Sequence, residues 1–234
     1  VDARDIIVET PHFDLLPGHE DLANFDSELQ SSGRRGIDQY NVVREQLEDL
    51  ASDYDIIILD CQATLSDLVD NAIVGARNIV VPIELSPKGD ASQQGLEDTI
   101  DAMKSGFGPM GVDISVRATI PSRVGNAKIF EQYRERIENE RDVPLSPFSI
   151  PEHSLLRYTW DQKMDLFEFI ESDDTRDLRS YEEHVPLAFK VIGRWLTGDL
   201  SYADAVAKWD EVKDQEMGDA TPEALLDDTD QGVA

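Results

Sequence analysis

The sequence has few of the residues that build disulfides and zinc sites. It contains one cysteine, Cys61, so no disulfide can form within the chain. Its four histidines do not pair at the short spacing typical of zinc ligands; they are His12, His19, His153 and His184. We therefore expect no histidine metal site, and we interpret Cys61 as a small buried side chain beside an apolar segment.

Basic residues are also scarce. The chain has 21 lysine and arginine residues, of which 7 are lysine, against 49 aspartate and glutamate residues, and its formal net charge is −28. Such a surface repels itself at low ionic strength, so we interpret the composition as adaptation to a salt-rich cytoplasm. The alternative is an acidic protein built to meet one basic partner, but the acidic residues are spread along the whole chain.

Long apolar runs are absent as well. No stretch of about 18 apolar residues occurs, and the sequence does not open with a basic segment followed by an apolar one. The composition therefore predicts neither a membrane span nor a signal peptide, and we expect a cytoplasmic protein with no membrane partner. The 234 residues, of which 40% are hydrophobic, suffice for one sizeable α/β domain with a tail.

What the sequence does contain is a regular alternation of apolar strand-like segments with helical periodicity. We expect strands at 5–9, 13–18, 54–60, 78–84, 112–120 and 144–150, and helices at 37–50, 65–76, 91–104, 126–140 and 181–196. Such alternation is typical of βαβ units, so the predicted fold class is α/β with a mostly parallel, doubly wound sheet. Ligands of these sheets bind at the carboxyl ends of the strands.

The expected domain organisation is simple. Residues 1–198 form the α/β domain, and residues 199–217 form a C-terminal amphipathic helix. Residues 218–234 are acidic and rich in small side chains, so we expect a disordered tail there.

One stretch carries the chemistry. In "DYDIIILDCQATLSDL", residues 53–68, an expected buried strand ends in Asp60. A carboxylate in that position is costly unless it has a partner. It could hold a hydrated Mg2+ beside a nucleotide, accept a phosphoryl group as a nucleophile, or cap the helix that follows. The stretch alone leaves all three interpretations open.

The neighbouring segments resemble one family. In order, the chain contains "FDLLPGHEDLANFDSEL" (13–29), "YDIIILDCQATLSDLVDNAIVGARNIVVPIEL" (54–85), "GLEDTIDAM" (95–103) and "SIPEHSLLRYTWDQKMDLFEF" (149–169). This collinear set, over residues 5 to 197, is similar to the ParA/MinD family of deviant P-loop ATPases, and most of all to its ParA and Soj partition proteins.

The resemblance implies a nucleotide site. Asp60 corresponds to the Walker B aspartate, which in the family orders Mg2+ and its waters beside the ATP phosphates. Pro82 closes the next strand on the nucleotide side. Ser122, with the loop after "ATIP", and Pro151, at the start of "IPEHS", correspond to segments that flank the adenine.

The sequence also departs from the family pattern. No Gly-Lys-Thr or Gly-Lys-Ser occurs, although the family begins with a strand, a Lys-Gly-Gly-Val-Gly-Lys-Thr loop and a helix that hold the phosphates. We interpret Lys88-Gly89 in "SPKGDAS" as a turn. The family's signature aspartate of the second strand is missing, Gln62-Ala63 replaces Pro-Pro, and Glu152 replaces an arginine.

Two explanations fit the absent phosphate loop. The chain is an N-terminally incomplete gene product that lacks its first βα unit, which we favour, or it is a degenerate relative that serves as a non-catalytic interaction scaffold. The family's first strand lies beside the Walker B strand, so its absence would expose a sheet edge and an apolar face. In either case we expect these residues not to hydrolyse ATP by the family mechanism.

A haloacid-dehalogenase-type phosphatase is the remaining enzyme class. Its motif needs an aspartate nucleophile and a second acid two residues later. "IIILDCQAT" offers Asp60 and Thr64 but has Gln62 at the position of the acid, and glutamine cannot transfer the proton.

The sequence thus predicts a ParA-like ATPase for plasmid or chromosome partitioning. The resemblance implies Mg2+ and ATP as cofactors, an ATP-dependent homodimer, nonspecific DNA binding and a ParB-like centromere-binding partner protein. For DNA contact the candidate residues are Arg134, Arg136, Arg157 and Arg194, each of which a surface ion pair would also explain.

Overall fold

The computed structural model describes residues 3–62, 66–124, 128–140, 145–146, 148–179 and 182–215. The chain divides into two compact units: unit 1 comprises residues 1–81 and 91–117, and unit 2 comprises residues 82–90 and 118–234. The chain passes from one unit to the other within strands β3 and β4 and helix α4. No helix in the described part of the chain is long and apolar enough to cross a membrane.

The N-terminal part of unit 1 contains less strand than predicted. A 3-10 helix at Ala3–Ile6 precedes β1 (Val8–Glu9), which pairs antiparallel with β2 (Asp14–Leu15). The two expected strands are therefore short arms of a hairpin, and they lie outside the parallel sheet. Their apolar side chains are exposed, because no other described element covers them.

Helices make up most of unit 1. They are a 3-10 helix at Glu20–Asn24, α1 (Phe25–Ser31), a 3-10 helix at Gly36–Tyr40, α2 (Val42–Glu48) and α3 (Asp67–Ala76). Buried Asn71 of α3 joins three of these segments: its side chain accepts a hydrogen bond from Val42 N (3.0 Å) and donates to the Gln39 (3.0 Å) and Asp67 (2.9 Å) carbonyls. The polar side chain is tolerated in the interior because both its oxygen and its nitrogen have hydrogen-bond partners.

The core of unit 1 lies between α3 and α4 (Pro87–Phe107). Ile73 and Val74 of α3 pack with Ile100 and Met103 of α4 and with Ile114, which precedes β4. A 3-10 helix at Gly108–Met110 ends the α4 segment. The apolar side chains recur every three or four residues in both helices, so each helix presents one continuous apolar face.

The main sheet has the strand order β3-β4-β5, from β3 (Asn78–Glu84), β4 (Ser115–Val124) and β5 (Ile150–Pro151). Strands β4 and β5 run parallel, and Leu145 adds a parallel bridge to Thr119. The predicted α/β fold with a parallel sheet is thereby confirmed. Pro82 lies within β3 and does not end it, which an edge strand of this sheet permits because proline cannot donate to a ladder.

The segment at 54–60 contradicts the prediction of a buried strand. It belongs to no strand, and the side chains of Ile56, Ile57 and Ile58 are exposed, that of Ile58 to 85%. The physical reason is that no described strand pairs with this segment, so neither a hydrogen-bonded ladder nor a covering face buries it. Cys61, which we expected to be buried, is exposed for the same reason.

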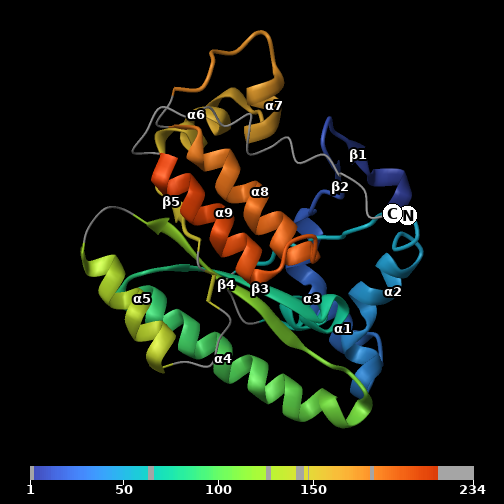
Figure 1. The fold of residues 1–234 in the computed structure, drawn as a ribbon. Coiled ribbons are helices and arrows are strands. Elements are labelled where there is room, and N and C mark those ends of the chain that lie inside the picture. The colour runs from blue at the N-terminus through green and yellow to red at the C-terminus, as the bar shows by residue number, and fades with distance from the viewer. Residues whose placement is uncertain are drawn as a thin grey trace, which may run out of the picture. The chain divides into compact units, whose positions relative to one another are not determined.

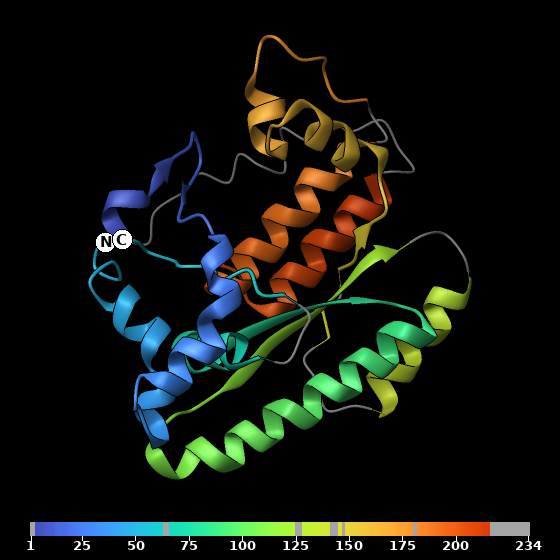
Figure 2. The same ribbon diagram turned by 180° about the vertical axis from the view of Figure 1, so that it is seen from behind.

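Unit 2 is built around the two long C-terminal helices. Helices α8 (His184–Thr197) and α9 (Tyr202–Gln215) lie side by side in both ribbon views (Figures 1 and 2). Val191 of α8 and Ala205 of α9 share one core with Ile120 of β4 and with Phe148. The tail predicted at 218–234 lies outside the described residues.

Three shorter helices complete unit 2. They are α5 (Lys128–Glu140), α6 (Ser154–Gln162) and α7 (Leu166–Glu171). Helix α5 packs through Ile137 on Ile83 of β3, while α6 and α7 join α8 through Leu155, Phe169 and Val185. Local capping explains where α7 begins, because the Asp165 carboxylate accepts hydrogen bonds from two backbone N–H groups of its first turn.

A buried ion pair links the loop after α7 to the start of α8. The two terminal nitrogens of the Arg176 guanidinium group, Nη1 and Nη2, donate to the Glu182 carboxylate at 2.6 and 2.7 Å. Arg179 N donates a further hydrogen bond to it at 2.9 Å. The Glu182 residue is only 1% exposed. The hydrogen bonds from Arg176 lower the pKa of Glu182 from 4.5 to about 2, so this carboxyl group is charged at all ordinary pH values.

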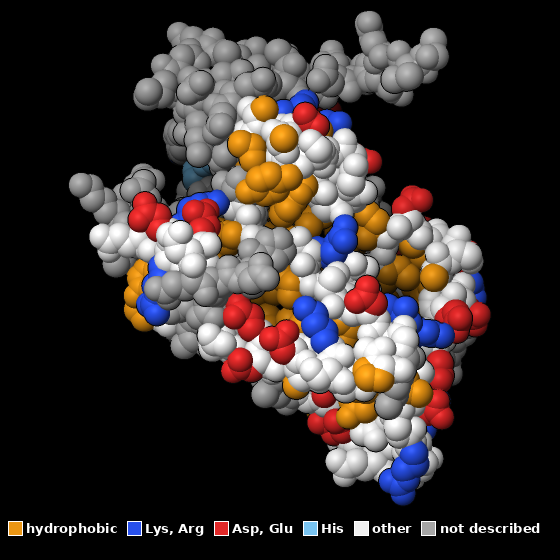
Figure 3. All heavy atoms as spheres, turned by 60° about the horizontal axis from the view of Figure 1, so that its bottom comes forward, with side chains coloured by type: hydrophobic (Ala, Val, Ile, Leu, Met, Phe, Trp, Pro, Cys, Tyr) orange, Lys and Arg blue, Asp and Glu red, His pale blue; other side chains and the backbone are white. Residues whose placement is uncertain are grey.

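Charges of both signs are mixed on the surface. On the face drawn in Figure 3, acidic and basic side chains are scattered singly and in small groups, with no large block of either sign. In the sequence, the acidic residues are likewise spread along the whole chain.

Candidate nucleotide site

The first candidate residue is Asp60, which lies in unit 1 on the extended segment before α3. Its side chain is exposed, and it forms no hydrogen bond or ion pair with the other residues that the structure describes. A carboxylate in this state can accept hydrogen bonds from the water shell of a cation.

The cap of α3 removes one of the three interpretations of Asp60. Ser66 is the N-cap, and its hydroxyl accepts a hydrogen bond from Val69 N at 3.3 Å. Asp60 lies six residues earlier, so the helix-cap interpretation is wrong. Helix α3 begins at Asp67, close to the predicted start at Leu65.

The other two candidates, Ser122 and Pro151, lie in unit 2 at the carboxyl ends of neighbouring parallel strands. Ser122 of β4 pairs in register with Ile150 of β5, and Val124 pairs with Pro151. The hydroxyl of Ser122 donates to the Ile120 carbonyl at 3.2 Å. The structure thus brings together two positions 29 residues apart in sequence, at the sheet edge where ligands of parallel sheets bind.

An irregularity in the register marks the same edge. Between the two paired positions stands Arg123, whose backbone adopts a left-handed conformation with φ of 57°. A residue other than glycine in this conformation costs on the order of 1 kcal/mol or more, so the surrounding structure must hold it there. Such residues cluster at ligand-binding edges, which makes this edge a candidate site on geometric grounds.

Charged side chains cross the strand ends. Arg123 Nη1 lies 2.8 Å from Glu84 at the end of β3, and its Nη2 lies 3.6 Å from Glu152, which follows β5. Glu152 also pairs with Arg157 of α6 at 3.0 Å. All four side chains are solvent-exposed, so each pair contributes only about 0–1 kcal/mol and can open when a ligand competes.

Sequence reasoning missed Arg123 and Glu84. It singled out Ser122 and Pro151 through the resemblance, whereas the arginine and the glutamate are ordinary surface residues in the sequence. A signal was nevertheless present, because each is the first charged residue after an apolar strand segment, in "TIPSR" and "VVPIE".

Lys88-Gly89 is not a turn, as we predicted, but part of the first turn of α4, directly after β3. Gly89 N donates to the Ser86 hydroxyl at 3.1 Å. A Cβ atom on Gly89 would lie 1.9 Å from the carbonyl oxygen of Glu84, so only glycine fits this close approach. The glycine therefore serves the packing of helix on strand, without the glycine spacing of a phosphate loop.

The four arginines proposed for DNA contact differ in their surroundings. Arg134 is partly buried and held by Glu138, the Ser146 carbonyl and the Ser149 hydroxyl. Arg157 pairs with Glu152, whereas Arg194 on α8 has no ion pair with any described residue. Arg136 is exposed on α5. Arg134 thus stabilises the α5 packing.

The residues present fit part of a Mg-nucleotide complex. Mg2+ is usually bound through one or two carboxylates, several waters and the phosphates, and a single exposed Asp60 is compatible with that demand. In the described part of the chain no group of three or more histidine, cysteine or acidic side chains is arranged to hold a metal directly. The sequence contains no Gly-Lys-Thr or Gly-Lys-Ser loop whose backbone N–H groups and lysine could bind the phosphates.

Comparison with known proteins agrees with this fold and sequence pattern. Residues 1–107 match the family profile described as an AAA domain. The chain is 30% identical over 101 residues to the chromosome partitioning protein ParA of Myxococcus xanthus, a match that covers 43% of this chain and 34% of the relative. The chain spans about a third of the length of the curated relatives it matches.

Solved structures share the fold. The McdA protein of Cyanothece in its apo form aligns with a TM-score of 0.59 at 24% identity, covering 81% of this chain and 73% of that protein. Cobyrinic acid a,c-diamide synthase of Mycobacterium smegmatis, with ADP and magnesium bound, aligns with a TM-score of 0.58 at 20% identity, covering 70% and 69%.

These likenesses show that the chain shares its α/β fold with these proteins. In sequence, it is similar over 101 and 97 residues to the partition proteins ParA and Soj.

Proposed function

We propose that this chain is part of a ParA-like partition ATPase, in which Asp60 of unit 1 orders Mg2+ and the strand edge at Ser122 and Pro151 of unit 2 flanks the adenine. The observation that carries the proposal is the register of β4 on β5, which joins Ser122 and Pro151 at one strand edge. Asp60, exposed and without a partner among the described residues, supplies the carboxylate for hydrated Mg2+.

The roles follow from the chemistry of each group. The Asp60 carboxylate accepts hydrogen bonds from metal-bound water and so orients the cation. The strand edge at Ser122 and Pro151 offers backbone groups and a hydroxyl to the neutral adenine ring, which needs hydrogen-bond partners and a flat surface. Bound Mg2+ would neutralise phosphate charge during phosphoryl transfer.

We propose that residues 1–234 by themselves do not hydrolyse ATP. Phosphoryl transfer depends on groups that position the phosphates and neutralise their charge, and a P-loop supplies these through backbone N–H groups and lysine. The sequence contains no Gly-Lys-Thr or Gly-Lys-Ser. The domain organisation that we propose is an α/β domain over residues 1–198, a C-terminal helix at 199–217 and an acidic tail at 218–234.

The proposal includes the assemblies known for the family: an ATP-dependent homodimer, nonspecific DNA binding and a ParB-like partner. The support for these is the likeness to partition proteins. DNA binding in particular would have to overcome the net charge of −28, so it would depend on local contacts between arginine side chains and phosphates.

The test compares residues 1–234 with a loop-bearing chain, in which the segment encoded upstream of the Val1 codon is joined to them. We expect that segment to contain an in-frame Lys-Gly-Gly-x-Gly-Lys-Thr, and we expect ATP turnover by the loop-bearing chain alone. Upstream sequence without such a loop, or equal absence of turnover in both chains, would contradict the ATPase proposal and leave a non-catalytic scaffold.

A further inference from the structure

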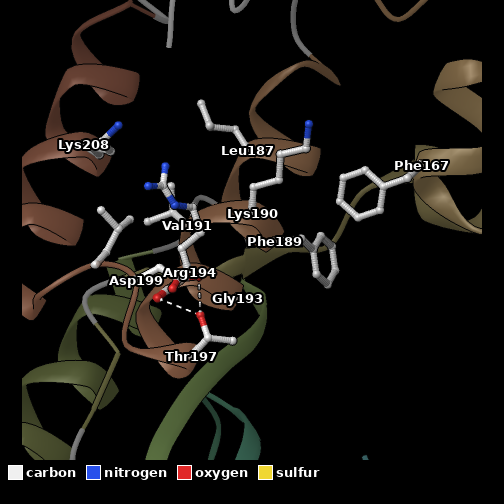
Figure 4. A pocket seen from close by; sticks show the side chains of 11 residues that line it. Phe167, Leu187, Phe189, Lys190, Val191, Gly193, Arg194, Thr197, Asp199 and Lys208 are labelled. Carbon is white, nitrogen blue, oxygen red and sulfur yellow. Dashed lines mark hydrogen bonds between the residues drawn. The ribbon is translucent and has the colours of Figure 1, made fainter. Parts of the chain in front are cut away.

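A groove of about 470 Å3 lies among α7, α8 and α9 of unit 2 (Figure 4). Apolar side chains form much of its lining: Phe167, Leu187, Phe189, Val191 and Leu200. An apolar groove of this size on a surface helix pair is large enough to hold two or three side chains of a peptide.

The groove also carries positive charge. Lys190, Arg194 and Lys208 line it, and in Figure 4 their charged ends extend in the same direction, away from Thr197 and Asp199. Lys190 Nζ lies 5.5 Å from the centre of the Phe167 ring, which holds it over the groove.

Within the described residues, one carboxylate lines the groove, and it belongs to Asp199. Its Oδ2 accepts a hydrogen bond from the Thr197 hydroxyl at 2.9 Å. Lys190 and Arg194 form no ion pair with any described residue. Two cations without an ion-pair partner among the described residues thus lie beside one carboxylate, in a chain in which acidic residues outnumber basic ones by 49 to 21.

The chain contains a segment with the complementary chemistry. Residues 216–234 carry six acidic residues and no basic one, and they include a single leucine pair, Leu225-Leu226. Glu223 precedes the pair by two residues and Asp227-Asp228 follows it directly. An apolar pair between carboxylates matches an apolar lining between cations.

The connection is long enough. Helix α9 is described to Gln215, and Lys208 lies seven residues earlier, about 10 Å along the helix axis. Leu225 follows Gln215 by ten residues, which span up to about 33 Å when extended. The leucine pair can therefore fold back to the groove with slack to spare.

We propose that residues 216–234 dock in this groove of the same chain, with Leu225 and Leu226 against its apolar lining and the flanking carboxylates beside Lys190 and Arg194. Tethering helps, because a short linker gives an effective concentration in the millimolar range, so a contact whose dissociation constant is well below that value is largely formed. The docked tail covers the cations until a competing ligand displaces it. This inference does not depend on nucleotide binding.

The experiment measures how readily a thiol in the groove reacts. In the full chain with Cys61→Ser, Gly193→Cys places a thiol in the groove, and Gly106→Cys places one on α4 as the control. Both glycines are exposed in helices, and a Cβ atom at either has no other atom within 4 Å. Each reporter is combined with the native tail or with Leu225→Asp and Leu226→Asp, and its rate of reaction with a neutral maleimide is measured.

We expect the tail substitutions to raise the rate at position 193 at least about fivefold, as follows from a mostly occupied tethered contact, and to leave the rate at position 106 unchanged. Equal rates at position 193 with both tails, or equal rises at both positions, would overturn the proposal. Protection that disappears on hundredfold dilution would show the tail of a second copy in the groove and would overturn docking within one chain.

A charge variant tests the electrostatic part. Arg194→Glu should bring the ratio of rates with and without the tail substitutions close to one. Arg117→Glu makes the same charge change at an exposed position of β4 and should leave that ratio as it is. A ratio that Arg194→Glu does not change would show that the cations do not hold the tail.

Discussion

Two apolar segments, one in each unit, differ in burial. Ile56, Ile57 and Ile58 of unit 1 are exposed and belong to no strand, whereas Ala118, Thr119 and Ile120 in β4 of unit 2 are buried. The first run is the more hydrophobic of the two. What separates them is the neighbourhood, because β4 has strands on both sides and α8 against its face, while no described strand pairs with the first run.

The difference teaches that hydrophobicity alone does not place a strand in a core. An extended segment must give each N–H and C=O group a partner, and a sheet does so only through adjacent strands. The exposed isoleucines form an extended segment whose backbone groups have no partner strand among the described residues.

The largest predicted effect comes from one substitution made in both runs. Ile120→Ala removes a buried side chain, 5% exposed, from a core that contains Phe148 and Val191, and should lower the free energy of unfolding by about 2–5 kcal/mol. Ile58→Ala, at an 85% exposed position, should change it by less than about 0.5 kcal/mol. Denaturant unfolding at constant salt measures both.

Similar costs for the two substitutions would contradict this comparison, because they would mean that Ile58 is buried in solution. In the loop-bearing chain we expect the difference to shrink, since a neighbouring strand would cover Ile58. The two variants thus report whether a neighbouring strand covers the 54–60 segment in the loop-bearing chain.

A second comparison concerns ion pairs. The pKa of Glu182 in unit 2 is lowered to about 2 by hydrogen bonds from Arg176, and that of exposed Glu45 in unit 1 is lowered by a hydrogen bond from Arg34. A group whose pKa is lower in the folded chain than in the unfolded chain stabilises the fold above its unfolded value. For Glu182 this contribution is complete above pH about 4.5 and is lost as the pH falls towards about 2.

Glu182→Gln should therefore destabilise the protein most near neutral pH, by on the order of 2–3 kcal/mol for the lost charge interaction. The difference in unfolding free energy between parent and variant should shrink below pH about 4.5. Glu45→Gln should show the same trend with a smaller amplitude, because water screens the exposed pair. A Glu182→Gln difference that does not vary between pH 7 and pH 3 would refute the charged pair.

Much of the fold could be predicted because local sequence determined it. The strand 78–84 coincides with β3, and the expected helices at 126–140 and 181–196 lie close to α5 and α8. Helices α6 and α7 escaped prediction because they are short, and their starts depend on caps at His153 and Asp165 that periodicity does not register. Lys88-Gly89 was misassigned for a similar reason, since the helix that contains it begins with proline and glycine.

The site was predictable only in part. The resemblance selected Ser122 and Pro151, and the register of β4 on β5 joins them. It could not show that Arg123 bridges Glu84 and Glu152, because that contact depends on a left-handed backbone and on which strands become neighbours. The burial of the 54–60 segment failed as a prediction because burial depends on a partner strand, and no described strand pairs with this segment.

The most direct test of the central claim is the magnesium dependence of ATP affinity in the loop-bearing chain, measured for Asp60→Ala and for Asp55→Ala. Both aspartates are exposed on the same extended segment, so each variant removes one charge from it. We predict that Mg2+ no longer strengthens ATP binding in Asp60→Ala, a loss of at least about tenfold, while Asp55→Ala binds as the parent does. Unchanged magnesium-dependent affinity in Asp60→Ala would contradict the assignment of this chain as the magnesium side of a partition ATPase.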